Sequence, residues 1–435
     1  MTAVAEDDVR LECCIAGCGP AGAMLGLLLA RAGLKVLVLE KHGDFLRDFR
    51  GDTIHPSTLE ILDELGLAEP FLQLSHSEVA SVTARTPAGL DIAFSFRRLK
   101  TRFPFIAFVP QWDFLDFITD EAARYPGFQL KMNAEVVGLV QKDGVVRGLT
   151  YRDACGEHAV RARLTVGADG RSSRTREAAG LRVIATSPPM DVLWFRLSRR
   201  PEEPETIAMR SGPGKAAILI DRHEYWQIGY IIPKGDAEKV RAAGLPAFRR
   251  TLAELIPDLA DRVDEIQDWE QVKLLTVRSD RLAHWYTRGY LAIGDAAHAM
   301  SPVAGVGINV AIQDAVVAAN VLWEPLRRGR ISTRDLARVQ RERELSVRLT
   351  QAVQAFIQQM FFKAVLTSVK PPVLPQKMLR ALLGVPVVGD LPALFVAFGI
   401  RRPHVESPAL ATPVEQPTAT NRAEAVPAWT RSWRT

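Results

Sequence analysis

The chain of 435 residues has no run of 18 or more uncharged apolar residues, which argues against a membrane-spanning helix. Its first eight residues are acidic, and they do not form the basic segment followed by an apolar one that marks a secretory signal. We therefore expect a cytoplasmic protein. With 47% apolar and 24% charged residues, the composition is typical of a globular protein, and the length indicates about two domains.

Cysteine is scarce, and three of the four cysteines fall in one short segment. Cys13, Cys14 and Cys18 lie in the first apolar run and its turn, where cysteine acts as a small apolar residue. No second Cys or His pair at metal-ligand spacing lies nearby. The pattern predicts free thiols and no metal site.

An excess of charge of one sign is also lacking, because the formal net charge is only +5. The basic clusters at 97–102 and 327–330 are typical of solvated faces, and they could also attract an anionic coenzyme such as NADPH. No nucleic-acid-binding module accompanies them, so we expect no nucleic-acid partner.

The chain does contain a Gly-rich loop at 17–22, between an apolar run at 9–16 and a predicted helix. Gly17 permits a tight turn, Gly19 lets the backbone approach a pyrophosphate, and Gly22 lets the helix pack closely on the strand. The helix N-terminus would offer N–H groups to the phosphates.

Glu40 ends the next predicted strand, at 35–40, and completes a βαβ unit. A carboxylate at this place accepts hydrogen bonds from an adenosine ribose. Loop, helix and Glu40 together predict a bound dinucleotide; the alternative is a Gly-rich turn that binds nothing.

A second loop lies far along the chain, at 289–309, where an apolar strand ends in Gly294-Asp295 and a Gly-rich turn opens a helix near 306. Asp295 can accept hydrogen bonds from a polyol such as ribityl, or it can simply cap a helix. Gly305 and Gly307 would let the chain lie against a flat ring. Two such loops suggest one long cofactor, and FAD is the obvious candidate.

A third element at 166–176 is a strand, a turn with Asp169, and a capped helix. It can bind a nucleotide, or it can be a purely structural turn. The run at 190–275 is rich in Trp, Phe, Tyr and Ile between Pro-Gly turns, which predicts an antiparallel sheet in a second domain.

In this order, the motifs at 17–22 with Glu40, at 167–170 and at 294–309 resemble the class A flavoprotein monooxygenases, the group of p-hydroxybenzoate and phenol hydroxylases. The resemblance implies an α/β fold in which a Rossmann-like FAD-binding domain is interleaved with an antiparallel-sheet substrate domain and followed by C-terminal helices. It also implies that FAD is contacted by Gly17, Gly19, Pro20, Ala21, Gly22, Glu40, Lys41, Arg50, Gln111, Val136, Asp169, Gly294, Asp295, Pro302, Gly305, Gly307, Ile308 and Asn309.

On this basis we expect residues 1–75, 105–185 and 275–350 to form the discontinuous FAD-binding domain, and 76–104 with 186–274 to form the substrate domain. A helical segment at 351–403 and a flexible tail at 404–435, rich in Pro, Ala, Thr and Ser, would follow. The apolar stretch near 356–366 could touch a membrane or a partner chain, although packing against the protein is favoured.

The resemblance implies that NADH or NADPH reduces FAD, that O₂ adds at flavin C4a, and that the hydroperoxide transfers one oxygen atom to an apolar aromatic or unsaturated small molecule. No catalytic side chain is expected, because the flavin carries the chemistry. Candidates for the substrate pocket are Trp194, Arg196, Gln227 and Tyr230.

Three other functions remain open: an FAD-dependent reductase or dehydrogenase of the same superfamily, a non-catalytic flavoprotein redox sensor, and a flavin-dependent halogenase. The halogenase is disfavoured, because the strand from Trp226 lacks the second Trp of a Trp-x-Trp-x-Ile motif.

Overall fold

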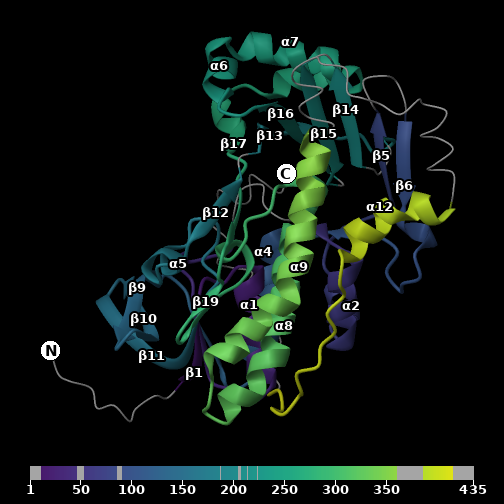
Figure 1. The fold of residues 1–435 in the computed structure, drawn as a ribbon. Helices are drawn as coiled ribbons and strands as arrows, with labels where there is room; N and C mark the ends of the chain where they lie inside the picture. The colour runs from purple at the N-terminus through teal and green to yellow at the C-terminus, as the bar shows by residue number, and fades with distance from the viewer. Residues whose placement is uncertain are drawn as a thin grey trace.

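The computed structural model describes residues 11–46, 53–85, 91–186, 188–203, 207–212, 214–222, 224–359 and 386–414. Two large sheets lie at opposite ends of the molecule, and long helices run beside the first of them (Figure 1). The structure has the α/β architecture expected from the sequence, with a parallel Rossmann-like sheet and an antiparallel substrate sheet.

The first sheet carries the N-terminal Gly-rich loop at the end of its central strand. The order is β19-β20-β11-β1-β2-β8, and β1 pairs in parallel with both β2 and β11. Residues 13–16 of β1 are fully buried, as expected for a strand covered on both faces. The strands are β1 (Leu11–Ala16), β2 (Val36–Leu39), β8 (Phe128–Lys131), β9 (Glu135–Lys142), β10 (Val145–Asp153), β11 (Gly156–Gly167), β19 (Tyr286–Thr287) and β20 (Tyr290–Ala292), of which β9 and β10 extend β11 as an antiparallel arm.

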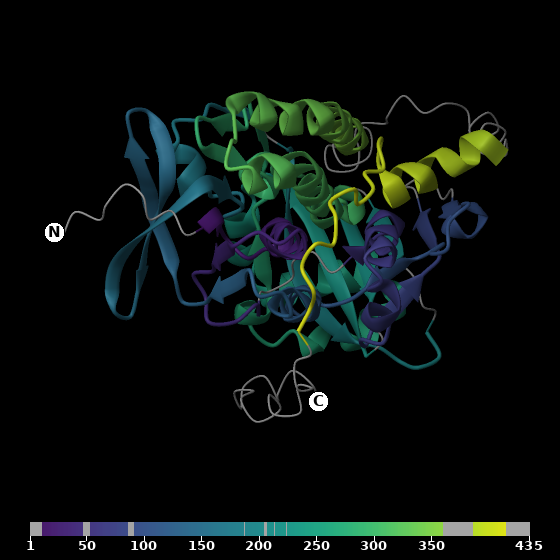
Figure 2. The same ribbon diagram turned by 90° about the horizontal axis from the view of Figure 1, so that it is seen from below.

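Long helices share one apolar core with this sheet. They are α1 (Pro20–Arg31), α4 (Gln111–Ala123), α8 (Gly307–Arg327) and α9 (Thr333–Ile357). Seen from below, α8 and α9 run side by side next to α1 (Figure 2). By length and composition the segment Val303–Arg327 could cross a membrane, but 83% of its apolar window is buried in the protein, as in the core helix of a globular protein.

The second sheet has the order β17-β13-β16-β15-β14-β5-β6, and helices α6 and α7 lie on one of its faces (Figure 1). Most of its neighbouring strands are antiparallel, and β14 pairs with β5 in parallel. Its elements are β5 (Ser81–Arg85), β6 (Asp91–Ser95), β13 (Met190–Ser198), β14 (Ile207–Gly212), β15 (Lys215–Asp221), β16 (Tyr225–Pro233), α6 (Ala237–Ala242), α7 (Leu245–Leu255) and β17 (Lys273–Leu275), with the 3-10 turns η2 (Pro257–Glu265) and η3 (Trp269–Gln271).

The opposite face of this sheet packs toward the first domain. There Trp194 of β13 belongs to an apolar cluster, which we call the interdomain cluster, together with Val79, Phe96, Leu99, Ile106, Phe108, Met190, Val192, Ala216, Ile220, Ile231, Val277, Ala393, Ala397 and Phe398. Val303, from the second Gly-rich loop, and Val396 pack against it. The interdomain cluster therefore joins the substrate sheet to the loop expected to meet the flavin ring.

Shorter elements connect the two ends of the molecule. They are β3 (Thr53–Ile54), α2 (Pro56–Glu64), α3 (Ala68–Leu72), β4 (Ser77–Val79), η1 (Phe96–Arg98), β7 (Ile106–Phe108), α5 (Arg174–Ala178), β12 (Val183–Thr186) and β18 (Ser279–Leu282). Strands β3, β7 and β4 form a small sheet, and β12 pairs with β18 where the chain passes between the domains.

The prediction of a flexible tail from residue 404 is wrong for 404–414. Leu410 and Ala411 donate backbone N–H groups to the Arg31 carbonyl at 3.0 Å, and Val414 donates to the Arg124 carbonyl at 2.7 Å. These carbonyls lie at the ends of α1 and α4, where helices leave carbonyl groups without internal partners. The polar composition suggested disorder, but the backbone is held by these helix ends. Residues 415–435 lie outside the described residues.

One secondary-structure expectation is wrong and another is confirmed. The sequence at 130–137 is strand-like throughout, but the structure divides it into β8 and β9, because Asn133 has a left-handed φ of 53° between them. The sequence at 306–369 predicts a long helical stretch with a break near Pro325 and Gly329, and the break is present: α8 ends at Arg327 and Gly329 follows with φ 68°, a common way to end a helix. Phe356 is 63% exposed, and residues 360–369 of this stretch lie outside the described residues.

The packing of Trp194 predicts the cost of a small change at Gly229. A Cβ there would lie 2.9 Å from the Trp194 ring and from Ile218, so Gly229→Ala should lower the free energy of unfolding by about 1–3 kcal/mol. Gly212→Ala is the matched control: among the described residues its Cβ would meet only Leu255, at 3.7 Å, and the change should stay within about 0.5 kcal/mol. Denaturant unfolding of both variants tests this, and equal stabilities would refute it.

Candidate functional site

The loop between β1 and α1 is closely packed on its inner side and open at Gly19. A Cβ on Gly17, whose φ is 92°, would lie 2.5 Å from the Ala168 carbonyl oxygen, and a Cβ on Gly22 would lie 2.0 Å from the Gly17 carbonyl oxygen. A Cβ on Gly19 would meet no atom within 4 Å among the described residues. The backbone is therefore accessible at the position where a pyrophosphate is expected.

The N-terminus of α1 lies at the same point. Its N-cap is Gly19, which offers no side chain to bind the first N–H groups, and Pro20 occupies the first helical position. The free N–H groups and the positive end of the helix dipole favour a phosphate. An uncapped helix end and an open glycine thus fit the pyrophosphate of FAD.

Glu40 lies beside this loop, as the sequence predicted, and its side chain also shapes it. Its carboxylate accepts from the Cys18 N–H at 3.0 Å and from the His42 N–H at 3.2 Å. Each carboxylate oxygen can accept a second bond, so the group can hold the loop and still accept from a ribose hydroxyl. The Glu40 carbonyl accepts from the Ala134 N–H at 2.8 Å, which brings the segment with Val136 to the same edge. Lys41 is exposed.

The third motif lies directly under the loop. The Ala168 N–H donates to the Ala16 carbonyl at 2.8 Å, next to Gly17. The carboxylate of Asp169 accepts from the Thr175 N–H at 3.0 Å and from the hydroxyls of Thr175 and Ser173, so it caps α5. The structural role left open for Asp169 is therefore present, and its contact with a nucleotide stays a prediction.

The Gly294-Asp295 turn, η4 (Gly294–Ala296), lies against the start of α1. A Cβ on Gly294, whose φ is 58°, would be 3.0 Å from the Ala21 Cβ and 3.3 Å from the Ala311 Cβ. Asp295 is partly exposed, and its carboxylate lies 4.0 Å from the Arg171 guanidinium. The two loops that are most distant in the sequence are thus in contact.

The buried carboxylate of Asp314 binds a backbone N–H group of this turn. Asp314 of α8 accepts from the Gly294 N–H at 3.0 Å, and its oxygens lie 2.6 Å from His298 Nε2 and 2.7 Å from Arg343 Nε. The Asp314, His298 and Arg343 side chains are at most 1% exposed. Burial acts to raise the pKa of Asp314, but His298 and Arg343 outweigh it and hold that pKa below its ordinary value.

A second buried ion pair supports the same turn from the side of the third motif. Both terminal nitrogens of the Arg176 guanidinium bind the Asp280 carboxylate, at 3.2 and 3.3 Å, and one also donates to the Ala296 carbonyl at 3.3 Å. Asp280 in turn accepts from the Ala299 N–H. The loop after Asp295 is therefore fixed from two sides.

The loop before α8, which contains η5 (Val303–Gly305), is tied to β3. A Cβ on Gly305, whose φ is 62°, would lie 2.7 Å from the Thr53 hydroxyl, which donates to the Gly305 carbonyl at 2.9 Å. Asn309 donates to the Thr53 carbonyl and accepts from the His55 N–H and the Thr58 hydroxyl. Pro302 and Gly307 are partly buried, and Ile308 is buried.

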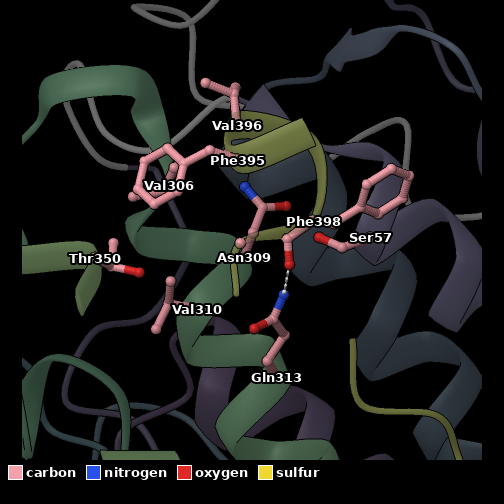
Figure 3. Close-up of a pocket in the computed structure, with 10 residues that line it drawn as sticks. Ser57, Val306, Asn309, Val310, Gln313, Thr350, Phe395, Val396 and Phe398 are labelled. Carbon is pink, nitrogen blue, oxygen red and sulfur yellow. Dashed lines mark hydrogen bonds between the residues drawn. The ribbon is translucent and has the colours of Figure 1, made fainter. Parts of the chain in front are cut away.

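A small cavity adjoins this loop (Figure 3). Asn309 and Gln313 extend from α8, and the Gln313 amide donates to the Phe398 carbonyl of α12 (Pro386–Phe398) at 3.5 Å. The other lining residues are Ser57, Val306, Val310, Thr350, Phe395, Val396 and Gly399. The C-terminal helix α12 thus forms part of the wall beside the loop at 302–309, which is expected to meet the flavin ring and which we call the flavin-type loop.

The other two predicted cofactor residues are Gln111 and Arg50. Gln111 is half-buried at the start of α4, which packs along α1. Arg50 lies outside the described residues.

Three of the four substrate-pocket candidates lie on the face of the second sheet that bears the interdomain cluster. Trp194 is opposite Gly229, and Arg196 is directly opposite Gln227. The Arg196 guanidinium lies 4.4 Å from the Tyr225 ring centre, and Gln227 accepts from Arg222 at 2.7 Å.

The prediction that Tyr230 lines the same pocket is wrong. Residues 227 and 230 are an odd number of positions apart on one strand, so they point to opposite faces. Tyr230 packs on Phe248 of α7, with ring centres 5.6 Å apart.

Several residues that shape the site were not found from the sequence: Arg176, Asp280, Asp314, Arg343 and His55. Their partners lie between 16 and 341 positions away, and only the folded chain brings them together. His298 lies near the second Gly-rich loop in the sequence, where a histidine could be a general base, but it is buried against the Trp285 ring and bound to Asp314.

The Asp314 network predicts the effect of removing its arginine. Arg343→Met removes the guanidinium that pairs with the buried Asp314 carboxylate, so the free energy of unfolding should fall by about 3–5 kcal/mol. Arg338→Met, which removes an exposed partner of Glu342 on the same helix, should cost less than about 1 kcal/mol. Denaturant unfolding compares the two, and similar losses would contradict the assignment.

The same network predicts a dependence on pH. Because the pKa of Asp314 is lowered by folding, its contribution to stability is complete above the ordinary Asp pKa of about 4 and is lost as the pH falls through the lowered value. In Arg343→Met that pKa should rise towards the ordinary value, so the variant should lose less stability than the wild type as the pH falls below about 4. Denaturant unfolding of both proteins at neutral pH and at several pH values below about 4 measures these losses, and equal acid-induced losses would contradict the account.

The chain is similar to known proteins over most of its length. A family model described as "FAD binding domain" matches residues 10–354. The 6-methylpretetramide 4-monooxygenase of Streptomyces rimosus is 31% identical over 352 residues, covering 80% of this chain and 84% of that protein. The 12-dehydrotetracycline 5-monooxygenase/anhydrotetracycline 6-monooxygenase of the same species is 27% identical over 73% of this chain, and the match spans 62% of its length.

Among solved structures, the p-nitrophenol 4-monooxygenase of Pseudomonas putida has a TM-score of 0.71 at 20% identity, covering 90% of this chain and 99% of that one. This likeness shows the shared fold. The family model and the Streptomyces relative show that the similarity is also one of sequence. The chain therefore belongs to the family of FAD-dependent monooxygenases.

Proposed function

We propose that this protein uses NADH or NADPH and O₂ to insert one oxygen atom into an apolar aromatic or unsaturated small molecule. The observation that carries the proposal is the interdomain cluster, which brings Trp194 of the substrate sheet and Val303 of the flavin-type loop into one apolar region. Oxygen transfer needs such a region, because water would divert the activated oxygen to hydrogen peroxide.

The cofactor would be held along the contacts described above. The N-terminus of α1 and Gly19 would receive the pyrophosphate, Glu40 the adenosine ribose, and Asp295 the ribityl chain. The loop from Pro302 to Asn309 would lie against the ring system. When bound, FAD supplies the exchange of electrons with NAD(P)H and the activation of O₂.

The residues of the chain then bind and orient the substrate and exclude water. Trp194 and the apolar side chains around it would cover the rings of the substrate. Arg196 and Gln227, at the polar end of the same face, are suited to an oxygen-bearing group. The two Streptomyces relatives are named as monooxygenases of 6-methylpretetramide and of 12-dehydrotetracycline and anhydrotetracycline, which supports a polycyclic aromatic substrate.

An FAD-dependent reductase remains the alternative. The digeranylgeranylglycerophospholipid reductase of Methanocella arvoryzae is 24% identical over 75% of this chain. A reductase does not transfer oxygen to its substrate, so the mass of the product separates the two reactions.

The open side of Gly19 predicts a variant that keeps the fold and loses the cofactor. Serine is a favourable N-cap, so Gly19→Ser should leave the stability of the apoprotein unchanged or raised. Its side chain would fill the pyrophosphate position and bind the helix N–H groups, so affinity for FAD should fall by roughly tenfold or more. Gly22→Ser is the contrasting variant, since its Cβ would lie 2.0 Å from the Gly17 carbonyl and should disturb the fold itself. Flavin fluorescence titration and thermal unfolding measure both effects, and full FAD affinity in Gly19→Ser would contradict the placement.

Oxidation of NADH and of NADPH by the FAD-loaded protein tests the function itself. With a panel of phenols and polycyclic aromatic compounds, at least one should accelerate coenzyme oxidation and gain one oxygen atom from ¹⁸O₂ by mass spectrometry. Stimulated oxidation without ¹⁸O incorporation into any product would favour the reductase, and oxidation that no compound stimulates would favour the redox sensor.

A further inference from the structure

His55 lies at the junction of the two halves of the site. It precedes α2, and its backbone N–H donates to the Asn309 side chain at 2.9 Å. The same side chain donates to the Thr53 carbonyl and accepts from the Thr58 hydroxyl. Thr53 is bonded in turn to Gly305. The backbone of His55 is therefore part of the same hydrogen-bonded unit as the flavin-type loop.

The imidazole of His55 reaches the C-terminal wall of the site. Its Nδ1 lies 2.6 Å from the carbonyl oxygen of Val396 in α12. Val396 lines the cavity of Figure 3 and packs against the interdomain cluster, which contains Trp194. His55 is thus bonded through its backbone to Asn309, in the loop that would meet the flavin ring, and through its ring to Val396, which packs against the apolar region that would hold the substrate.

The bond to Val396 fixes the chemical state of the ring. A carbonyl oxygen only accepts, so Nδ1 carries the proton, and in a neutral imidazole Nε2 is then an acceptor. Burial lowers the pKa of His55 to about 4, against a smaller opposite effect of the Val396 bond, so the ring is neutral near pH 7. Among the described residues no charged side chain contributes to this shift.

The acceptor atom has no partner within the described part of the chain. His55 is 0% exposed, and its Nε2 is buried without a hydrogen bond to any described residue. A buried polar atom left in this state costs free energy, and such atoms are rare in folded proteins. A ligand that brings a donor to this position would remove the cost.

We propose that His55 Nε2 accepts a hydrogen bond from a hydroxyl group of the aromatic substrate, which makes His55 a residue that selects and orients hydroxylated rings. The inference rests on the proposed function, because it takes the interdomain cluster to be the substrate region. The site favours a phenol over the corresponding ether, since an ether oxygen brings no donor and leaves Nε2 unpaired. The neutral ring binds the hydroxyl without removing its proton beforehand.

Two substitutions separate this role from a structural one. In His55→Asn, the side-chain amide can still donate to Val396 from the position of Nδ1, but the acceptor at Nε2 is lost. In His55→Gln, the amide oxygen can take the position of Nε2 and restore an acceptor. His76→Asn is the matched control, because His76 Nδ1 also lies close to a backbone carbonyl, that of Leu74 at 2.8 Å.

The test is the binding of 2-naphthol and 2-methoxynaphthalene to the oxidised FAD-loaded protein, followed by flavin fluorescence. The wild type and His76→Asn should prefer 2-naphthol by about tenfold, the ratio expected for one hydrogen bond to a buried acceptor. His55→Asn should reduce the ratio to near one, and His55→Gln should restore part of it. A wild type that binds both probes equally, or neither, overturns the proposal, as does an unchanged preference in His55→Asn.

A second measurement uses the wild type alone and stays decisive if the variants fold poorly. In protein labelled with ¹⁵N-histidine, the Nε2 resonance of His55 should have the position of an unprotonated nitrogen and should shift on addition of 2-naphthol but not of the ether. An Nε2 that carries the proton, or one that does not respond to 2-naphthol, overturns the proposal. FAD content and NAD(P)H oxidation are measured separately, so a failure of the proposed function would be seen independently.

Discussion

The architecture depends on how closely three backbone segments approach one another at the N-terminal end of α1. Gly17 meets Ala168, Gly22 meets the Gly17 carbonyl, and Gly294 meets Ala21, in each case at a distance that leaves no room for a larger side chain. These contacts bring together the uncapped start of α1, the Glu40 carboxylate and the Gly294-Asp295 turn. The rest of the first domain keeps these backbones in position.

Buried charges maintain that arrangement. Asp314 and Arg176 each bind a backbone group of the Gly294–Ala299 region, and each is paired with a buried opposite charge. Replacing such a pair by apolar residues can leave stability unchanged, whereas removing one partner is costly. We therefore infer that these ion pairs fix the backbone geometry of the Gly294–Ala299 loop, in addition to any contribution to stability.

Much of the fold and of the cofactor region could be predicted from the sequence, because the signals are local. Gly17, Gly19, Gly22 and Glu40 have their meaning within one βαβ unit, and the period-two pattern of β13 places Trp194 and Arg196 on one face. The order of the three motifs then supplied the family. The spacing of these residues along the chain also shows which loop follows which strand.

Other features depend on contacts between distant residues, and the sequence did not reveal them. The bond of His55 to Val396 and the ties of residues 404–414 to α1 and α4 join segments more than 280 positions apart. Tyr230 was misplaced because the alternation along β16 does not show which of its two faces meets the pocket, and Asn133 interrupted a strand through its backbone conformation. Composition alone made the 404–414 segment look disordered, although backbone groups hold it.

The central claim is that one extended cofactor spans the distance from the end of α1 to the loop at Gly305–Asn309, with its adenosine part bound at Glu40. Calorimetric titration of the apoprotein with FAD and with FMN tests this most directly, because FMN has the ring and the ribityl chain but lacks the adenosine part. The account predicts tight binding of FAD and binding of FMN that is weaker by at least about a hundredfold, since the contacts with the second phosphate and the ribose are missing. Equal affinities for FAD and FMN, or no affinity for either, would contradict it.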